Sequence, residues 1–254
     1  MLTTRYVPGA PNWIDLGTPD VEAAAAFYGS LLGWNFRSAG PQAGGYGFFE
    51  LDGKVVAAVG PLTQEGAVPA WTPYFHTADA DATAKAVEQA GGTVRIAPDD
   101  VFDKGRMAAF TDPGGAEFAV WQPGTTKGLD LVTENGSLAW LELYVPGLDV
   151  VRPFYQAVFD WKVQDIAFGD MPYLLLSTAG DDSQDLGGVM ALQEGDRPHW
   201  LSYFEVADCD ASVARVRELG GGLVAPAVDI EDVGRFAVLS DPHGARFAVI
   251  ASVG

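Results

Sequence analysis

An internal duplication constrains the fold of this 254-residue chain more than any other feature of its sequence. The stretch DPGGAEFAV at 112–120 returns as DPHGARFAV at 241–249, with seven of nine positions identical. The repeat covers most of the chain, because Trp13, Phe27-Tyr28 and Trp34 recur 127 residues later as Trp140, Phe154-Tyr155 and Trp161. Landmarks from Trp71 to Asp112 recur at an offset of 129 residues. Two stable offsets indicate duplication with one short insertion. We therefore predict two homologous domains, 1–126 and 127–254, joined through the turn-rich segment QPGTTKG.

Each copy is itself divided into two similar units. In the first unit, apolar spacing predicts a helix over 20–32, between Pro19 and Gly33. The patterns predict strands at 13–18, 34–38, 46–51 and 55–59, then at 73–78, 93–97, 107–111 and 117–121, and a second helix at 80–90. One strand, one helix and three strands therefore make a unit, each copy holds two units, and the fold class is α+β.

The motifs that carry this layout are FYGSLLGW at 27–34, W-x-x-Y-F at 71–75, AGG at 90–92, GR at 105–106 and the terminal DPxGxxF. In DPxGxxF, Asp-Pro with a glycine is expected to set the turn before the last strand. With these motifs the chain resembles the vicinal oxygen chelate superfamily of glyoxalases, bleomycin-resistance proteins and dioxygenases, and in particular its tandem two-domain glyoxalase-like members of actinobacterial type. The resemblance covers 9–122 and 136–251. It implies that the two βαβββ units of each domain form a curled mixed sheet around a cleft. The motifs are specific for the fold and weak for the reaction, because this scaffold hosts many chemistries and pure binders.

The resemblance also implies where a divalent metal would bind. Metal-using members place His, Gln or Glu donors at positions that correspond here to Trp13, Thr72 and Ala119 in the first copy, and to Trp140, Leu201 and Ala248 in the second. Tryptophan, leucine and alanine supply no ligands to such metals. We therefore expect no metal and no other cofactor.

A displaced metal site in the first domain is the alternative. Strand alternation places Asp15 with Trp13, His76 with Tyr74, and Glu117 with Ala119. If those faces enclose the cavity, Asp15, His76 and Glu117 form a histidine–carboxylate site for a divalent metal. In the second copy these positions are Glu142, Glu205 and Arg246, and arginine is never a ligand. A degenerate glyoxalase-type lyase or a dioxygenase would follow from this alternative.

The paired tryptophan and carboxylate on each opening strand favour a binding function. A charge turned into a half-closed cleft costs several kcal/mol unless it is paired. Aromatic rings beside a carboxylate suit a flat or cationic organic molecule. We expect a small-molecule binder without metal, sequestering an antibiotic or a metabolite. The predicted ligand-binding residues are Trp13, Asp15, Tyr74, His76, Glu117, Trp140, Glu142, Tyr203, Glu205 and Arg246. A third possibility is an interaction protein whose clefts are filled by side chains.

Composition narrows the partners. The formal net charge is −19, from 34 acidic and 15 basic residues, which disfavours nucleic acid and anionic membranes. The chain contains no apolar run long enough to span a membrane, and MLTTRYVPGAPNW lacks the features of a signal peptide. A single cysteine, Cys209, excludes an internal disulfide. We expect a cytoplasmic protein, and the sequence leaves the oligomeric state open.

Overall fold

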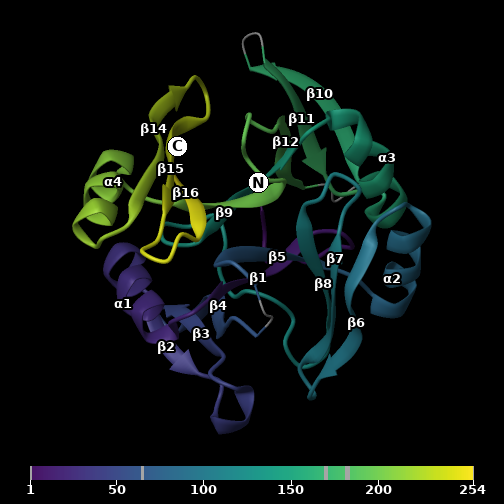
Figure 1. Ribbon diagram of the computed structural model, residues 1–254, viewed down its shortest axis with the longest axis horizontal. Coiled ribbons are helices and arrows are strands. Elements are labelled where there is room, and N and C mark those ends of the chain that lie inside the picture. Colours follow the sequence, from purple (N-terminus) through teal and green to yellow (C-terminus); the bar gives the residue numbers. More distant parts are fainter. Residues whose placement is uncertain (1, 64–65, 169–170, 181–183, 254) are drawn as a thin grey trace. The chain divides into compact units, whose positions relative to one another are not determined.

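The computed structural model describes residues 2–63, 66–168, 171–180 and 184–253 (Figure 1). The first copy contains β1 (Pro11–Thr18), α1 (Val21–Leu32), β2 (Asn35–Ser38), the 3-10 turn η1 (Pro41–Ala43), β3 (Gly47–Leu51), β4 (Lys54–Pro61), β5 (Ala70–His76), α2 (Ala80–Gln89), β6 (Thr93–Val101), β7 (Gly105–Thr111) and β8 (Glu117–Pro123). The second contains β9 (Leu138–Val145), α3 (Leu148–Phe159), β10 (Lys162–Phe168), β11 (Met171–Ser177), β12 (Asp185–Ala191), β13 (His199–Glu205), α4 (Cys209–Glu218), β14 (Gly222–Ile230), β15 (Gly234–Ser240) and β16 (Arg246–Ser252). The predicted α+β order is confirmed in all four units. None of the helices described is long and apolar enough to cross a membrane.

Each copy forms one eight-stranded mixed sheet. The strand orders are β2-β3-β4-β1-β5-β8-β7-β6 and β10-β11-β12-β9-β13-β16-β15-β14. Within each βαβββ unit, the opening strand pairs in parallel with the last strand, as β1 does with β4 and β5 with β8. The remaining strands of the unit pair as antiparallel hairpins. The four opening strands β1, β5, β9 and β13 therefore occupy the middle of their sheets.

Local sequence explains why the first helix begins and ends where it does. The side chain of Asp20 caps α1 by accepting from the backbone N–H of Ala23 at 2.9 Å. Gly33 ends the helix in the left-handed conformation, at a φ of 77°, which glycine adopts without strain. Phe27 and Tyr28 point from this helix into the core, as the spacing predicts.

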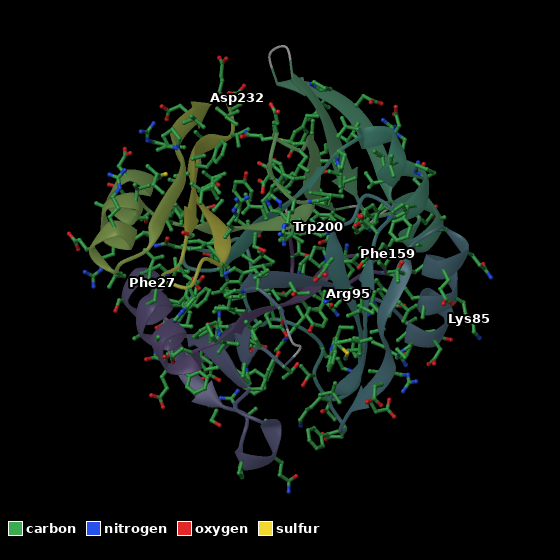
Figure 2. The ribbon with its side chains drawn as sticks, in the orientation of Figure 1. Phe27, Lys85, Arg95, Phe159, Trp200 and Asp232 are labelled. Atoms are coloured by element: carbon green, nitrogen blue, oxygen red, sulfur yellow. The ribbon has the colours of Figure 1, made fainter. Side chains whose placement is uncertain are left out.

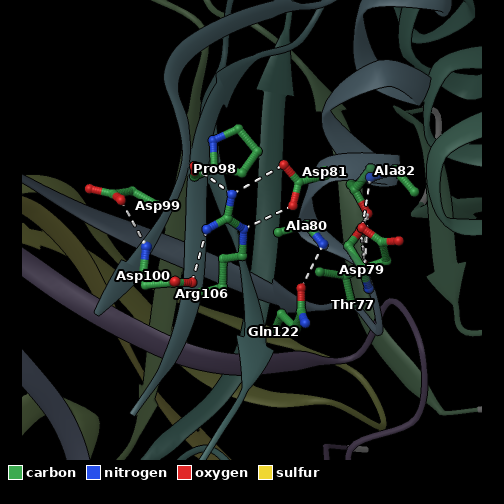
Figure 3. Close-up of polar contacts among 11 residues, drawn as sticks. Thr77, Asp79, Ala80, Asp81, Ala82, Pro98, Asp99, Asp100, Arg106 and Gln122 are labelled. Carbon is green, nitrogen blue, oxygen red and sulfur yellow. Dashed lines mark hydrogen bonds and ion pairs between the residues drawn. The ribbon is translucent and has the colours of Figure 1, made fainter. Parts of the chain in front are cut away.

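One sequence expectation is corrected at β6. The strand is predicted to end at Ala97, but it continues to Val101 and includes the exposed residues Asp99 and Asp100. Arg106 on β7 holds this extension in place (Figure 3). Its guanidinium binds Asp81 of α2 through two hydrogen bonds of 2.9 and 3.1 Å, and binds Asp100 at 2.9 Å. The second copy repeats the arrangement with Arg235, Asp210 and Asp229. We interpret this clamp as structural because it occurs identically in both copies.

The chain packs as two compact units, called unit 1 and unit 2, each of which is larger than a βαβββ unit and differs from a sequence copy. Unit 1 comprises Met1–Trp13, Thr72–Gly128 and Leu141–Trp200, and unit 2 comprises Ile14–Trp71, Leu129–Trp140 and Leu201–Gly254. Each unit therefore takes one βαβββ element set from each copy. The domain boundaries at 126 and 127 describe the repeat in the sequence and remain a prediction as boundaries of folding.

Asp112, from the duplicated motif, organises the core of unit 1. One carboxylate oxygen accepts from the N–H of Ala116 at 2.9 Å and closes the predicted turn. The other accepts from the hydroxyl of Tyr155 at 2.8 Å, and Tyr155 accepts from the indole of Trp200 at 3.2 Å. Burial raises the pKa of both Asp112 and Tyr155. Phe159 and Trp200, both labelled in Figure 2, belong to the same aromatic core, where the ring of Trp161 stacks on Phe159 and meets Trp200 edge to face.

Unit 2 contains the same network with the copies exchanged. Asp241 accepts from the N–H of Ala245 at 2.9 Å and from the hydroxyl of Tyr28 at 3.3 Å. Tyr28 accepts in turn from Trp71 at 3.0 Å. In both units the tyrosine comes from one copy and the aspartate from the other. The repeated DPxGxxF motif therefore sets a turn, as predicted, and also joins the two copies.

Candidate functional site

The predicted carboxylate of the first copy lies on a polar and aromatic strand face in unit 2. Asp15 on β1 is half-buried and accepts from the hydroxyl of Tyr46 at 3.1 Å. Strand register places Asp15 on the same face as Phe48 of β3 and Arg37 of β2. Asp15 and Phe48 both pair with Ala58 of β4, and Arg37 pairs with Phe48. We call Asp15, Arg37, Tyr46 and Phe48 the Asp15 face.

Packing across the Asp15 face is specific. The rings of Tyr46 and Phe48 meet edge to face at 6.1 Å, and the guanidinium of Arg37 lies 4.6 Å above the ring of Phe48. Gly60 accommodates the ring of Tyr46, because a Cβ atom there would lie 2.7 Å from it. The face combines a carboxylate, a phenol, an aromatic ring and a cation. Such a surface can contact a planar molecule and also offer it hydrogen bonds.

The corresponding carboxylate of the second copy is more deeply buried than Asp15. Glu142 on β9 is 6% exposed and accepts a short hydrogen bond from the hydroxyl of Tyr144. The ring of Tyr144 lies flat on His199, with centroids 5.0 Å apart. Tyr173 occupies the space above Gly188, which pairs with Glu142 in the sheet. The strand face that carries Glu142 is therefore covered by side chains of the second copy, among them Tyr144 and Tyr173.

Four predicted aromatic residues lie on or beside these strands. Trp13 is 7% exposed and stacks on Trp121 of β8, with ring centroids 6.5 Å apart. Tyr74 is buried on β5, and Tyr203 is buried on β13 beside Phe236. Trp140 is half-buried at the start of β9. Burial of the other three rings shows that they contribute to the core.

Three predicted charged residues have other partners or lie at the surface. Glu117 is mostly exposed and forms an ion pair of 2.6 Å with Arg95. Glu205 accepts from the backbone N–H and the hydroxyl of Ser252, at 2.9 and 2.7 Å. Arg246 is exposed at the start of β16. Their roles as ligand contacts stay predictions.

His76 is the one predicted residue that lines the described pocket of unit 1. This pocket of about 470 Å³ is lined by Thr4, Tyr6, His76, Thr77, Ala78, Gln122, Pro123 and Lys127, and we call it the His76 pocket. The Nδ1 atom of His76 is buried without a hydrogen-bond partner. Burial lowers the pKa of His76 from its ordinary value of 6.5, so the ring is neutral at pH 7.

The described residues do not fit a divalent metal of the kind that the resemblance implies. The corresponding positions carry Trp13 and Ala119, which offer no donor. Within the ranges that the structure covers, no three His, Cys, Asp or Glu side chains are grouped to hold a metal ion. Glu117, one member of the alternative site of Asp15, His76 and Glu117, forms an ion pair with Arg95.

Comparison with known proteins establishes the family. Residues 10–120 match the model of the glyoxalase/bleomycin resistance protein/dioxygenase superfamily, and 140–250 match a glyoxalase-like domain. The chain belongs to this superfamily. It is 44% identical to the anthracycline biosynthesis protein DnrV of Streptomyces peucetius, over 97% of this chain and 94% of the relative. It is 41% identical to the putative glyoxylase CFP32 of Mycobacterium bovis, over 97% and 96%.

Solved structures of this superfamily share the fold. The 2,2',3-trihydroxybiphenyl 1,2-dioxygenase of Sphingomonas wittichii matches with a TM-score of 0.67 at 14% identity, over 97% of this chain and 91% of that one. The Mn(II)-bound glyoxalase of Novosphingobium aromaticivorans matches with a TM-score of 0.65 at 16% identity, over 97% and 85%. At these identities the likeness is one of architecture, and the predicted tandem glyoxalase-like fold is confirmed.

Sequence reasoning missed most of the His76 pocket. Gln122 and Lys127 fall in the stretch interpreted as an interdomain linker, and Thr4 and Tyr6 precede the first predicted strand. One signal was available. Lys127 is a rare base in an acidic chain, close in sequence to the end of a strand.

Proposed function

We propose that the protein binds a flat aromatic organic molecule on the Asp15 face, without a metal. The observation that carries the proposal is the half-buried Asp15 carboxylate, bonded to Tyr46 beside a second ring and a cation. An ionised carboxylate offers about four acceptor positions, so it can accept from a ligand donor as well as from partners within the protein. The rings of Tyr46 and Phe48 supply aromatic contact area.

The class of ligand is supported by the relatives. Two proteins named for anthracycline biosynthesis, DnrV of Streptomyces peucetius and DauV of Streptomyces sp. strain C5, are 44% and 43% identical to this chain over 97% of its length. Anthracyclines are planar polycyclic molecules that carry hydroxyl and amino groups. These features match a face with aromatic rings and a carboxylate, which accepts from such donors. We propose a polycyclic aromatic compound of this kind as the ligand.

A titration with an anthracycline, monitored by quenching of tryptophan fluorescence, tests the proposal. We expect saturable binding that Asp15→Asn weakens by roughly 30-fold or more, because breaking a desolvated pair costs about 2–5 kcal/mol. Glu88→Gln is the matched control, since Glu88 is exposed on α2. Equal affinities for the wild-type and Asp15→Asn proteins would show that the carboxylate is structural.

Elemental analysis of the purified protein separates this proposal from the enzyme alternative. A binder of the proposed kind contains no stoichiometric zinc, iron, nickel or manganese. About one such ion per chain, lost in His76→Ala, would reject metal-free binding and support a glyoxalase-type or dioxygenase-type enzyme.

A further inference from the structure

The His76 pocket differs in charge from the rest of the chain. Its eight lining residues include one lysine and no aspartate or glutamate, although acidic residues outnumber basic ones by 34 to 15 in the whole sequence. Its volume of about 470 Å³ is within the range of small-molecule sites. All eight residues belong to unit 1. A pocket without carboxylates in so acidic a protein suits a ligand that is itself an acceptor or an anion.

Lys127 supplies the positive charge of the pocket. Its ammonium group donates to the carbonyl of Gly124 at 2.7 Å. Among the residues whose positions are described, no acidic side chain forms an ion pair with it. An ammonium group carries three hydrogens, so donors remain for a bound anion.

Gln122 presents an amide donor to the same pocket. Its Oε1 atom accepts from the backbone N–H of Ala80 at 2.9 Å, at the start of α2 (Figure 3). This bond fixes which end of the amide is the acceptor. The Nε2 group, with two hydrogens, is then the end that remains for a ligand.

His76 adds a third donor. Its ring is neutral at pH 7 and therefore carries a single N–H. Placing that hydrogen on the buried Nδ1 would leave a donor without a partner. With the hydrogen on Nε2, that nitrogen is a donor in the pocket that His76 lines. We assign the Nε2–H tautomer on this ground.

The second copy does not repeat these groups. At the positions of His76 and Gln122 it has Glu205 and Ala251, and the carboxylate of Glu205 accepts from Ser252. His76 and Gln122 are thus specific to the first copy, and Lys127 lies in the segment that joins the two copies. In this respect the donor set differs from the Arg106 clamp, which both copies share.

We propose that the His76 pocket is a binding site for a small organic carboxylate, held by Lys127, Gln122 and His76. The three groups are all donors, and a carboxylate has two oxygens that accept from more than one of them at once. This site does not depend on the Asp15 face, and it can exist whether or not an aromatic ligand binds there.

Isothermal titration with benzoate and its neutral analogue benzamide tests the proposal on the full-length protein. Benzoate is expected to bind saturably in the millimolar range, at least about tenfold more tightly than benzamide. Lys127→Gln removes the charge from an exposed side chain and should abolish the preference for benzoate. Lys85→Gln, on the exposed side of α2, is the matched control and should keep it.

Three results would overturn the proposal. They are absence of saturable benzoate binding, equal affinities for benzoate and benzamide, and a preference that survives in Lys127→Gln. Chemical shifts of the Gln122 side-chain amide should move with benzoate, and a response confined to other residues also contradicts the site. Benzoate binding should be unchanged in Asp15→Asn, so failure here and failure of the proposed function are distinguishable.

Discussion

The two copies differ most on the strand faces that carry Asp15 and Glu142. Asp15 is half-buried and bonds to Tyr46, which precedes a separate strand. Glu142 is buried and bonds to Tyr144, two residues along its own strand. The position that corresponds to Tyr144 is Gly17 in the first copy. The second copy therefore covers its carboxylate with its own tyrosine, and the first copy has no side chain at that position.

In contrast to these strand faces, the cores of unit 1 and unit 2 contain the same hydrogen-bond network. The Asp112–Tyr155–Trp200 network of unit 1 recurs as the Asp241–Tyr28–Trp71 network of unit 2. After duplication, the aspartate–tyrosine–tryptophan networks that join the copies have stayed the same, whereas the strand faces that carry Asp15 and Glu142 have diverged. The framework is thus common to both copies, and the Asp15 face on which we propose ligand binding lies in the first copy.

The largest expected effect follows from separating the copies. From the sequence alone we expect at least one of the fragments 1–126 and 128–254 to fold by itself. In the structure, however, the first fragment loses Asp241, the partner of Tyr28, and the second loses Asp112, the partner of Tyr155. We now expect neither half alone to unfold cooperatively as a monomer, and co-expression to restore a folded complex. Chemical denaturation followed by circular dichroism measures this. A cooperative, monomeric transition in either half would show that a copy is self-sufficient.

The fold was predictable because its signals are local and repeated. Asp112 was recognised as a turn residue from Asp-Pro-x-Gly, and that turn is present. Its second partner, Tyr155, was not predictable, because periodicity does not say which copy packs on which. The extension of β6 was missed because Pro98 and the two aspartates that follow it disfavour strands. β6 lies at the edge of its sheet, where proline is tolerated.

The candidate site was predictable only in part. Alternation along β1 and β5 identified Asp15 and His76, because a strand fixes which residues share a face. It could not supply Tyr46, which lies outside the predicted ligand set and reaches Asp15 through sheet pairing. Lys127 and Thr4 join the His76 pocket from irregular segments, for which sequence patterns give no position.

The next largest effect is a contrast between the two carboxylates. Glu142→Gln should lower the free energy of unfolding by about 1 kcal/mol, because an amide oxygen accepts the buried hydrogen bond from Tyr144 more weakly than a carboxylate does. Asp15→Asn should lower the free energy of unfolding by less, because Asp15 is only half-buried. Asp15→Asn should weaken ligand binding more than Glu142→Gln does. Urea denaturation and anthracycline titration of both variants check this, and a larger stability loss in Asp15→Asn contradicts the comparison.

A smaller effect is the pH dependence of stability that His76 produces in the first copy. Burial lowers the pKa of His76 below 6.5, so as the pH falls below that value the unfolded chain takes up a proton that the folded chain does not. Stability should therefore fall on this account from about pH 6.5 downward and be unaffected above it. His76→Asn should flatten this part of the curve in thermal denaturation at a series of pH values. An unchanged curve would assign the pH dependence to other groups.

The smallest expected effect concerns Glu117, where the second copy has Arg246. Glu117 is mostly exposed and pairs with Arg95, so Glu117→Gln should change the free energy of unfolding by about 0–1 kcal/mol. Increasing salt should reduce this difference, because salt screens exposed charges. The substitution should leave anthracycline and benzoate binding unchanged, since Glu117 lies neither on the Asp15 face nor in the His76 pocket. If Glu117→Gln instead removed a bound metal or abolished ligand binding, the displaced site of Asp15, His76 and Glu117 would replace the binding site proposed on the Asp15 face.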